Sequence, residues 1–209
     1  MIRKLLLASI LALCSQVATA QQDPDSPYME GKHYFEIKQA TAPSSSNTVE
    51  VIVLFSYLCG HCYTLEPYVD AWAKKQDDNV RTSRMHVNFG GASEMYARAY
   101  IVSQMTGVVG ESHPALMKAI WQERKRFRNL NQLAEFYTQF GLERKSFMAN
   151  FNSFAADSQL RRVERDAQIF GITGTPSIIV NRKYRVPNTT HVWEVVDYLV
   201  AKEAAATGT

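Results

Sequence analysis

Two cysteines separated by two residues, Cys59 and Cys62, stand in the stretch YLCGHCYTLEP, residues 57–67. Gly60 and His61 occupy the gap between them. Cysteines at this spacing can form a redox-active dithiol, half of a zinc site or a structural cross-link. Each of these chemistries makes a different demand on the rest of the chain.

The rest of the sequence argues against a cross-link and against a metal. A disulfide across two residues closes a very short loop and removes little entropy from the unfolded chain. Zinc needs four ligands, but the third cysteine belongs to the leader described below. The histidines outside the motif are scattered singly: His33, His86, His113 and His191. Covalent haem needs a histidine directly after the second cysteine, where Tyr63 stands. We therefore predict a Cys59–Cys62 pair that cycles between dithiol and disulfide, with no metal and no cofactor.

The first twenty residues predict a secretory signal peptide, residues 1–20. Arg3 and Lys4 precede an apolar stretch, and Ala18-Thr19-Ala20 forms an A-x-A cleavage site. Cleavage leaves two cysteines and lowers the formal net charge from +3 to +1, because two cations are removed. A nearly neutral chain without a basic stripe gives no reason to expect nucleic acid as a partner. The short basic run at residues 124–128 is predicted to be a solvated loop.

The motif lies between a predicted strand and a predicted helix. Residues 49–56 form an almost unbroken β-branched and aromatic run, typical of a strand buried on both faces of a partly parallel sheet. From Cys59 onward the apolar residues recur at helical spacing. Cys59 thus falls at the helix N-terminus, where free backbone N–H groups and the helix dipole stabilise a thiolate. A protonated His61 can add to this effect, and Cys62, one turn further in, is expected to be the shielded partner.

Further elements follow from periodicity and turn residues. Strands are predicted at residues 33–38, 80–89, 177–180 and 184–186, with a loop at 44–47. Residues 93–170 are predicted to be helical. Helices are expected to end at Gly141 and Gly171, and another to start at His113-Pro114. A last helix carries one apolar face made by Val192, Val195, Val196 and Leu199.

These features together resemble a known family. A strand, a C-x-x-C motif, a helix containing Pro67, and a Thr-Pro before a late hairpin resemble the thioredoxin fold. The long helical stretch, with HVNFGG at 86–91 and VNRKY at 180–184, resembles the DsbA family of bacterial periplasmic disulfide oxidoreductases. The resemblance covers nearly all of the chain after the leader. It implies an α/β protein with a thioredoxin-like domain at residues 21–91 and 166–209 and an inserted helical domain at 92–165.

The resemblance also implies roles for individual residues. Cys59 matches the nucleophile that carries the mixed disulfide, Cys62 the resolving thiol, and His61 the histidine that stabilises the thiolate. Pro176 matches a cis-proline, and Thr175 the preceding residue that hydrogen-bonds the substrate backbone. The family implies a monomeric periplasmic enzyme that donates a disulfide to exported, unfolded polypeptides with cysteines. A membrane partner similar to DsbB would reoxidise it.

Three departures from the family pattern leave the redox direction open. Gly60 stands where DsbA proteins have proline, which gives the CGHC of protein disulfide isomerases. Val53 replaces a buried glutamate six residues before the first cysteine, and Glu50 cannot replace it because strand alternation sends positions 50 and 53 to opposite faces. Arg84, which matches the glutamate's lysine partner, is therefore expected to reach solvent or a different acid. Thr175 is more typical of isomerases and reductases.

Several other residues have a functional and a structural interpretation. Tyr57 and Leu58 either contact substrate or pack at the strand end. His86 either touches the redox site or is a core histidine bonded to backbone, which we favour. Glu66 either tunes the thiols or is a solvated acid, and we favour the latter. Four methionines in the helical stretch are expected to fill the core rather than line a peptide groove: Met95, Met105, Met117 and Met148.

Three functions fit these features. We favour an oxidase that donates its disulfide. The first alternative is a disulfide isomerase or reductase, kept reduced by a different membrane protein. The second is a non-catalytic periplasmic chaperone that binds peptides in a groove around Pro176.

Overall fold

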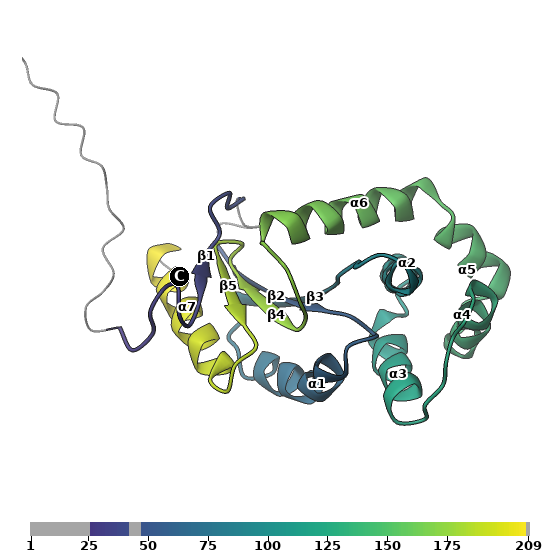
Figure 1. Ribbon diagram of the computed structural model, residues 1–209, viewed down its shortest axis with the longest axis horizontal. Coiled ribbons are helices and arrows are strands. Elements are labelled where there is room, and N and C mark those ends of the chain that lie inside the picture. The colour runs from purple at the N-terminus through teal and green to yellow at the C-terminus, as the bar shows by residue number, and fades with distance from the viewer. Residues whose placement is uncertain (1–25, 42–46, 208–209) are drawn as a thin grey trace, which may run out of the picture.

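The computed structural model describes residues 26–41 and 47–207. The predicted signal peptide and most of the predicted loop at 44–47 lie outside the described residues. A five-stranded sheet with the strand order β1-β5-β4-β2-β3 forms the centre (Figure 1). Its strands are β1 (Phe35–Glu36), β2 (Val49–Phe55), β3 (Val80–His86), β4 (Ser177–Val180) and β5 (Tyr184–Pro187). β2 and β3 run parallel and the other neighbouring pairs antiparallel, so the predicted partly parallel sheet is confirmed.

Helices connect and cover these strands. They are α1 (Gly60–Ala73), α2 (Ala92–Met105), α3 (Val109–Trp121), α4 (Leu130–Tyr137), the 3-10 helix η1 (Thr138–Phe140), α5 (Arg144–Phe151), α6 (Phe154–Ile169) and α7 (Val192–Thr207). The predicted ends at Gly141 and Gly171 are confirmed, because both glycines adopt the left-handed backbone that ends a helix, with φ of 79° and 64°. Among the described residues, no helix is both long and apolar enough to cross a membrane.

Three predicted elements have boundaries that are wrong by more than one residue. The first strand comprises only residues 35 and 36, because only they pair with β5. β3 ends at His86 rather than residue 89, since its partner β2 ends opposite it at Phe55. α3 starts at Val109, four residues before His113: the Ser112 N–H already donates to Val108 O at 2.9 Å. Pro114 therefore lies inside the helix rather than in its first turn.

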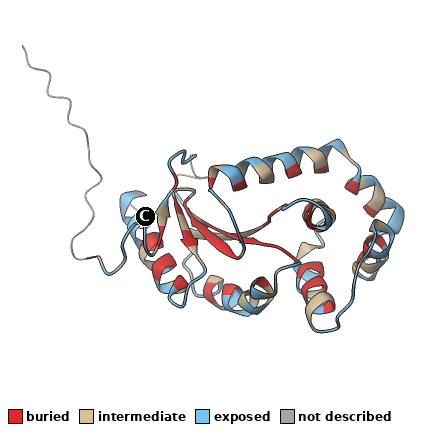
Figure 2. Ribbon diagram, viewed as in Figure 1, coloured by how far each residue is buried: buried red, intermediate tan, exposed pale blue. Residues whose placement is uncertain are grey.

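The two faces of the sheet pack against different helices. Val49, Val51 and Val53 of β2 pack against α1 and α7, whereas Ile52 and Leu54 pack against α6. Figure 1 shows α1 and α7 on one side of the sheet and α6 along the other. Figure 2 shows that the central strands are almost entirely buried. This alternation fixes the orientation of β2 in the sheet, and the cysteine motif follows directly after β2.

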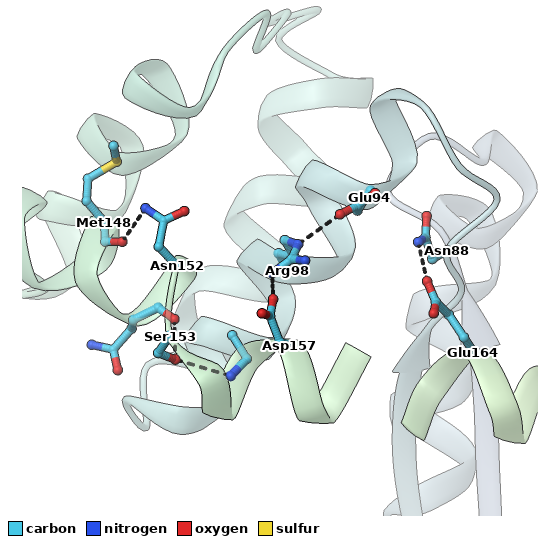
Figure 3. Close-up of polar contacts among 10 residues, drawn as sticks. Asn88, Glu94, Arg98, Met148, Asn152, Ser153, Asp157 and Glu164 are labelled. Carbon is cyan, nitrogen blue, oxygen red and sulfur yellow. Dashed lines mark hydrogen bonds and ion pairs between the residues drawn. The ribbon is translucent and has the colours of Figure 1, made fainter. Parts of the chain in front are cut away.

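Polar contacts join α2 and α6 beside the sheet (Figure 3). Arg98 of α2 pairs with Glu94 at 3.0 Å and with Asp157 of α6 at 2.5 Å. Asn88, just after β3, donates to Glu164 of α6 at 2.8 Å. Since α6 packs on α2 at one end and on the sheet at the other, it ties the helical region to the sheet. The division into domains at 21–91 with 166–209 and at 92–165 stays a prediction.

Candidate active site

Cys59 is the N-cap residue of α1. Its backbone is extended, and its Sγ accepts the Cys62 backbone N–H at 3.4 Å. The Cys59 N–H donates to Ser56 O at 3.0 Å and fixes the turn between β2 and the helix. Cys59 is half-buried and Cys62 is 1% exposed. The predicted difference in exposure between the two thiols is confirmed.

The two thiols differ in acidity. The pKa of Cys59 is lowered to about 5 by a hydrogen bond from the Cys62 side chain, which outweighs the opposing effect of burial. Hydrogen bonds from the Thr175 side chain and from the backbone N–H groups of Cys62 and His61 lower the pKa of Cys59 further. The same Cys59–Cys62 hydrogen bond, together with burial, raises the pKa of Cys62 well above its ordinary value. Because the thiolate is the nucleophile, this difference in acidity supports the prediction that Cys59 is the reactive sulfur.

Thr175 and Pro176 lie beside Cys59. The Thr175–Pro176 peptide bond is cis, as predicted. The Cys59 thiol donates to the Thr175 carbonyl oxygen at 3.2 Å across 116 residues of sequence. A groove of about 440 Å³ starts here, and it is lined by His61, residues 173–177, Arg185, Pro187 and Asn188. The His61 side chain is exposed and lines this groove.

An ion-paired cluster lies one helical turn from Cys62. Glu66 pairs with Arg84 at 2.8 Å and lies 3.2 Å from His113 Nε2. Arg84 also pairs with Asp70 at 2.6 Å, so the expectation that Arg84 reaches a different acid is confirmed. The expectation that Glu66 is a solvated acid is wrong, because only 15% of its side chain is exposed.

Charges around Glu66 explain its ionisation. Burial opposes the charged form, but the hydrogen bond and charge of His113 and the charge of Arg84 lower the pKa of Glu66 overall. His113 extends the cluster toward the motif, since its Nδ1 lies 3.0 Å from the Tyr57 hydroxyl. Sequence reasoning noted His113 only as a single histidine, because its partners are 47 and 56 positions away.

Tyr57 and His86 are packing residues behind the motif. Tyr57 is fully buried, so its possible contact with substrate is excluded, whereas Leu58 is 45% exposed and stays a candidate. His86 Nε2 accepts the Tyr57 backbone N–H at 3.0 Å. Burial lowers the pKa of His86 to about 3, so it is a neutral core histidine, as favoured from the sequence.

The sequence correctly predicted the surroundings of the methionines and of the basic run, but it did not indicate a role for Trp121. The methionines fill the core as expected: Met117 is buried, and Met95, Met105 and Met148 pack against buried clusters. The basic run at 124–128 is a loop with exposed cations, as predicted. Trp121 was missed entirely. Its indole N–H donates to the Tyr57 carbonyl at 3.0 Å, and its ring lies against Gly60.

Comparisons with known proteins agree with this geometry. The family model described as DSBA-like thioredoxin domain matches residues 83–200. The thiol:disulfide interchange protein DsbA of Pseudomonas aeruginosa is 32% identical over 209 residues, covering 98% of both chains. The chain belongs to the DsbA family. It is accordingly a thiol:disulfide oxidoreductase with a thioredoxin fold, as expected from the sequence.

Solved DsbA structures share the architecture. The crystal structure of Pseudomonas aeruginosa DsbA matches with a TM-score of 0.80 at 30% identity, over 87% of this chain and 97% of that one. DsbA from Xylella fastidiosa matches with a TM-score of 0.81 at 30% identity, over 85% of this chain and 98% of that one. The similarity therefore extends over both the sheet and the helical region.

The acidity of Cys59 predicts how stability depends on pH. The Cys59 thiol has a pKa of about 5 when folded, against an ordinary value of 9.0. The unfolded chain therefore binds more protons between these values, and the free energy of unfolding of the reduced protein rises with pH from about 5 to about 9. Denaturant titrations of reduced wild type and Cys59→Ala across this range measure the difference. Parallel curves for the two proteins would contradict the assignment.

The Glu66 cluster predicts a contrast between two neighbouring acids. Glu66→Gln leaves Arg84, whose side chain is 21% exposed, with a single exposed partner, and removing one member of a buried pair costs about 3 kcal/mol. The matched control is Asp70→Asn, whose acid is 61% exposed and is expected to contribute less than about 1 kcal/mol. Urea unfolding of both variants measures the two free energies. Equal losses would show that Glu66 is no more important than a surface charge.

Proposed function

We propose that this protein donates the Cys59–Cys62 disulfide to exported polypeptides in the periplasm. The observation that carries the proposal is the lowered pKa of the half-buried Cys59 thiol at a helix N-cap. A stabilised thiolate favours the reduced form of the pair, so the oxidised form gives its disulfide away readily. The family relationship supports this chemistry, since the relatives are named thiol:disulfide interchange proteins.

The proposed reaction has two exchange steps. A substrate thiolate attacks Cys59 Sγ, which forms a substrate–Cys59 disulfide, and the Cys59–Cys62 bond breaks. Cys62 leaves and takes up a proton, consistent with its raised pKa. A second substrate thiolate then attacks the substrate sulfur of the mixed disulfide and releases Cys59 as a thiolate. The substrate loses two electrons, and the Cys59–Cys62 pair gains them.

The groove beside Pro176 is the proposed substrate site. The backbone of an extended substrate segment can pair with Thr175, as chains do when they add to an exposed edge. Thr175 O already lies 3.2 Å from Cys59 Sγ, so a paired segment would bring a substrate cysteine close to the reactive sulfur. His61 lines the same groove, and we assign to it the stabilisation of the thiolate as well as contact with substrate.

The proposed setting follows from the leader and the family. The predicted signal peptide at residues 1–20 supports export, and a bacterial periplasm is the compartment in which such a disulfide donor acts. Reoxidation is assigned to a membrane partner similar to DsbB, which accepts two electrons from the dithiol. The working form is proposed to be a monomer.

Cys62→Ser tests this function by removing the resolving thiol. In this variant the Cys59 thiolate attacks a disulfide of an exported protein and releases one of its sulfurs as a thiolate, and the resulting mixed disulfide is expected to accumulate because Cys62 can no longer attack it. Non-reducing gels of periplasmic extract, with and without dithiothreitol, measure the adducts. The matched control is the double variant with Cys59→Ser and Cys62→Ser, which has no nucleophile and should form none.

The absence of reducible adducts in Cys62→Ser would overturn the proposal. If the double-serine variant also prevented aggregation of unfolded proteins as well as wild type does, a peptide-binding chaperone would be the better description.

A further inference from the structure

The backbone conformation of Gly60 does not require a glycine. It is the first residue of α1, and its φ lies outside the left-handed region that favours glycine. Glycine also costs conformational entropy in a helix relative to alanine. A neighbouring side chain must therefore explain why position 60 carries no Cβ.

That neighbour is Trp121, the last residue of α3. A Cβ added at Gly60 would lie 3.1 Å from Trp121 Cζ3 and 3.2 Å from Cη2. Ordinary van der Waals contacts of a Cβ fall between 3.4 and 4 Å. The six-membered part of the indole therefore fills the place of a side chain at position 60.

The Trp121 ring is also anchored. Its Nε1–H donates to the Tyr57 carbonyl oxygen at 3.0 Å, so the ring cannot slide away from Gly60 without breaking this bond. Tyr57 lies two residues before Cys59, and Gly60 lies directly after it. A single side chain from the helical region thus holds both sides of the reactive cysteine.

We infer that Trp121 is a positioning residue for the Cys59 thiolate and that it is the reason for glycine at position 60. The inference rests on the proposed function. The backbone N–H groups of His61 and Cys62 stabilise the thiolate only when the first turn of α1 aims them at Sγ. Trp121 fixes this turn from outside, through Gly60, and fixes the preceding chain through Tyr57.

Trp121→Phe is the direct test, because it removes the N–H donor and the ring atoms that face Gly60 while keeping an aromatic side chain. With the turn released, the proton affinity of the Cys59 thiolate is expected to rise about tenfold, the size of effect that a misaligned hydrogen bond to a charged group produces. The equilibrium constant for reduction of the pair by glutathione should fall by a similar factor. The pH dependence of thiolate absorbance and the fraction reduced in glutathione buffers measure these two quantities.

Trp72→Phe is the matched control. Trp72 belongs to α1, and its Nε1–H donates to Asp197 at 2.6 Å. It stacks on Trp193 of α7, with ring centroids 5.2 Å apart, in the cluster between the sheet and α7. The same chemical change there should lower the melting temperature but leave both the Cys59 pKa and the glutathione equilibrium at their wild-type values.

Gly60→Ala provides a second variant. With Trp121 present, the added methyl group should displace the first turn of α1 and raise the pKa of Cys59. In a Trp121→Phe background, the same methyl group should change this pKa little further. If Trp121→Phe and Trp72→Phe both lower only the melting temperature, and Gly60→Ala is additive with Trp121→Phe, then Trp121 is a packing residue and the inference is wrong. A wild-type pair that fails to exchange with glutathione at all would instead contradict the proposed function.

Discussion

The site depends on the hydrogen bonding of the Cys59 sulfur at the N-cap of α1, chiefly from the Cys62 side chain and also from the Cys62 backbone N–H at 3.4 Å. A helix N-terminus leaves N–H groups without partners, and an acceptor at the N-cap that carries negative charge is stabilised by them. β2 ends four residues before this cap. It is buried between α1 and α7 on one face and α6 on the other. The sheet thus fixes where α1 begins, and the start of α1 determines which of the two cysteines is acidic.

The acids that pair with Arg84 lie on α1 rather than at position 53 of β2. Val53 is 1% exposed and packs with the sheet core, directly opposite Arg84 in the ladder between β2 and β3. The arginine turns instead to Glu66 and Asp70 of α1. An arginine buried without a partner would be strongly destabilising, so the loss of an acid on the strand requires an acid on the helix. His113 of α3 completes this arrangement and connects it to Tyr57.

The sequence was informative wherever a feature is local. The strand before the motif, the helix after it and the helix ends at Gly141 and Gly171 follow from neighbouring residue types, whereas the cis Thr175–Pro176 bond was expected from the family resemblance. Contacts between distant segments were not predictable in this way. Trp121 reaches Tyr57 across 64 positions, and the length of β1 is set by its pairing with Tyr184 and Arg185 of β5, which are distant in the sequence. The fold class was therefore predictable, whereas the residues that hold the motif in place were not.

The central claim is that a stabilised Cys59 thiolate makes this pair an oxidant. Its reduction potential, measured by equilibrating the purified protein with mixtures of reduced and oxidised glutathione, tests this most directly. The account predicts a potential less negative than about −200 mV, more oxidising than glutaredoxins. A value near about −270 mV, that of thioredoxin, would show that the thiolate is not stabilised enough to drive disulfide donation and would identify the protein as a reductant.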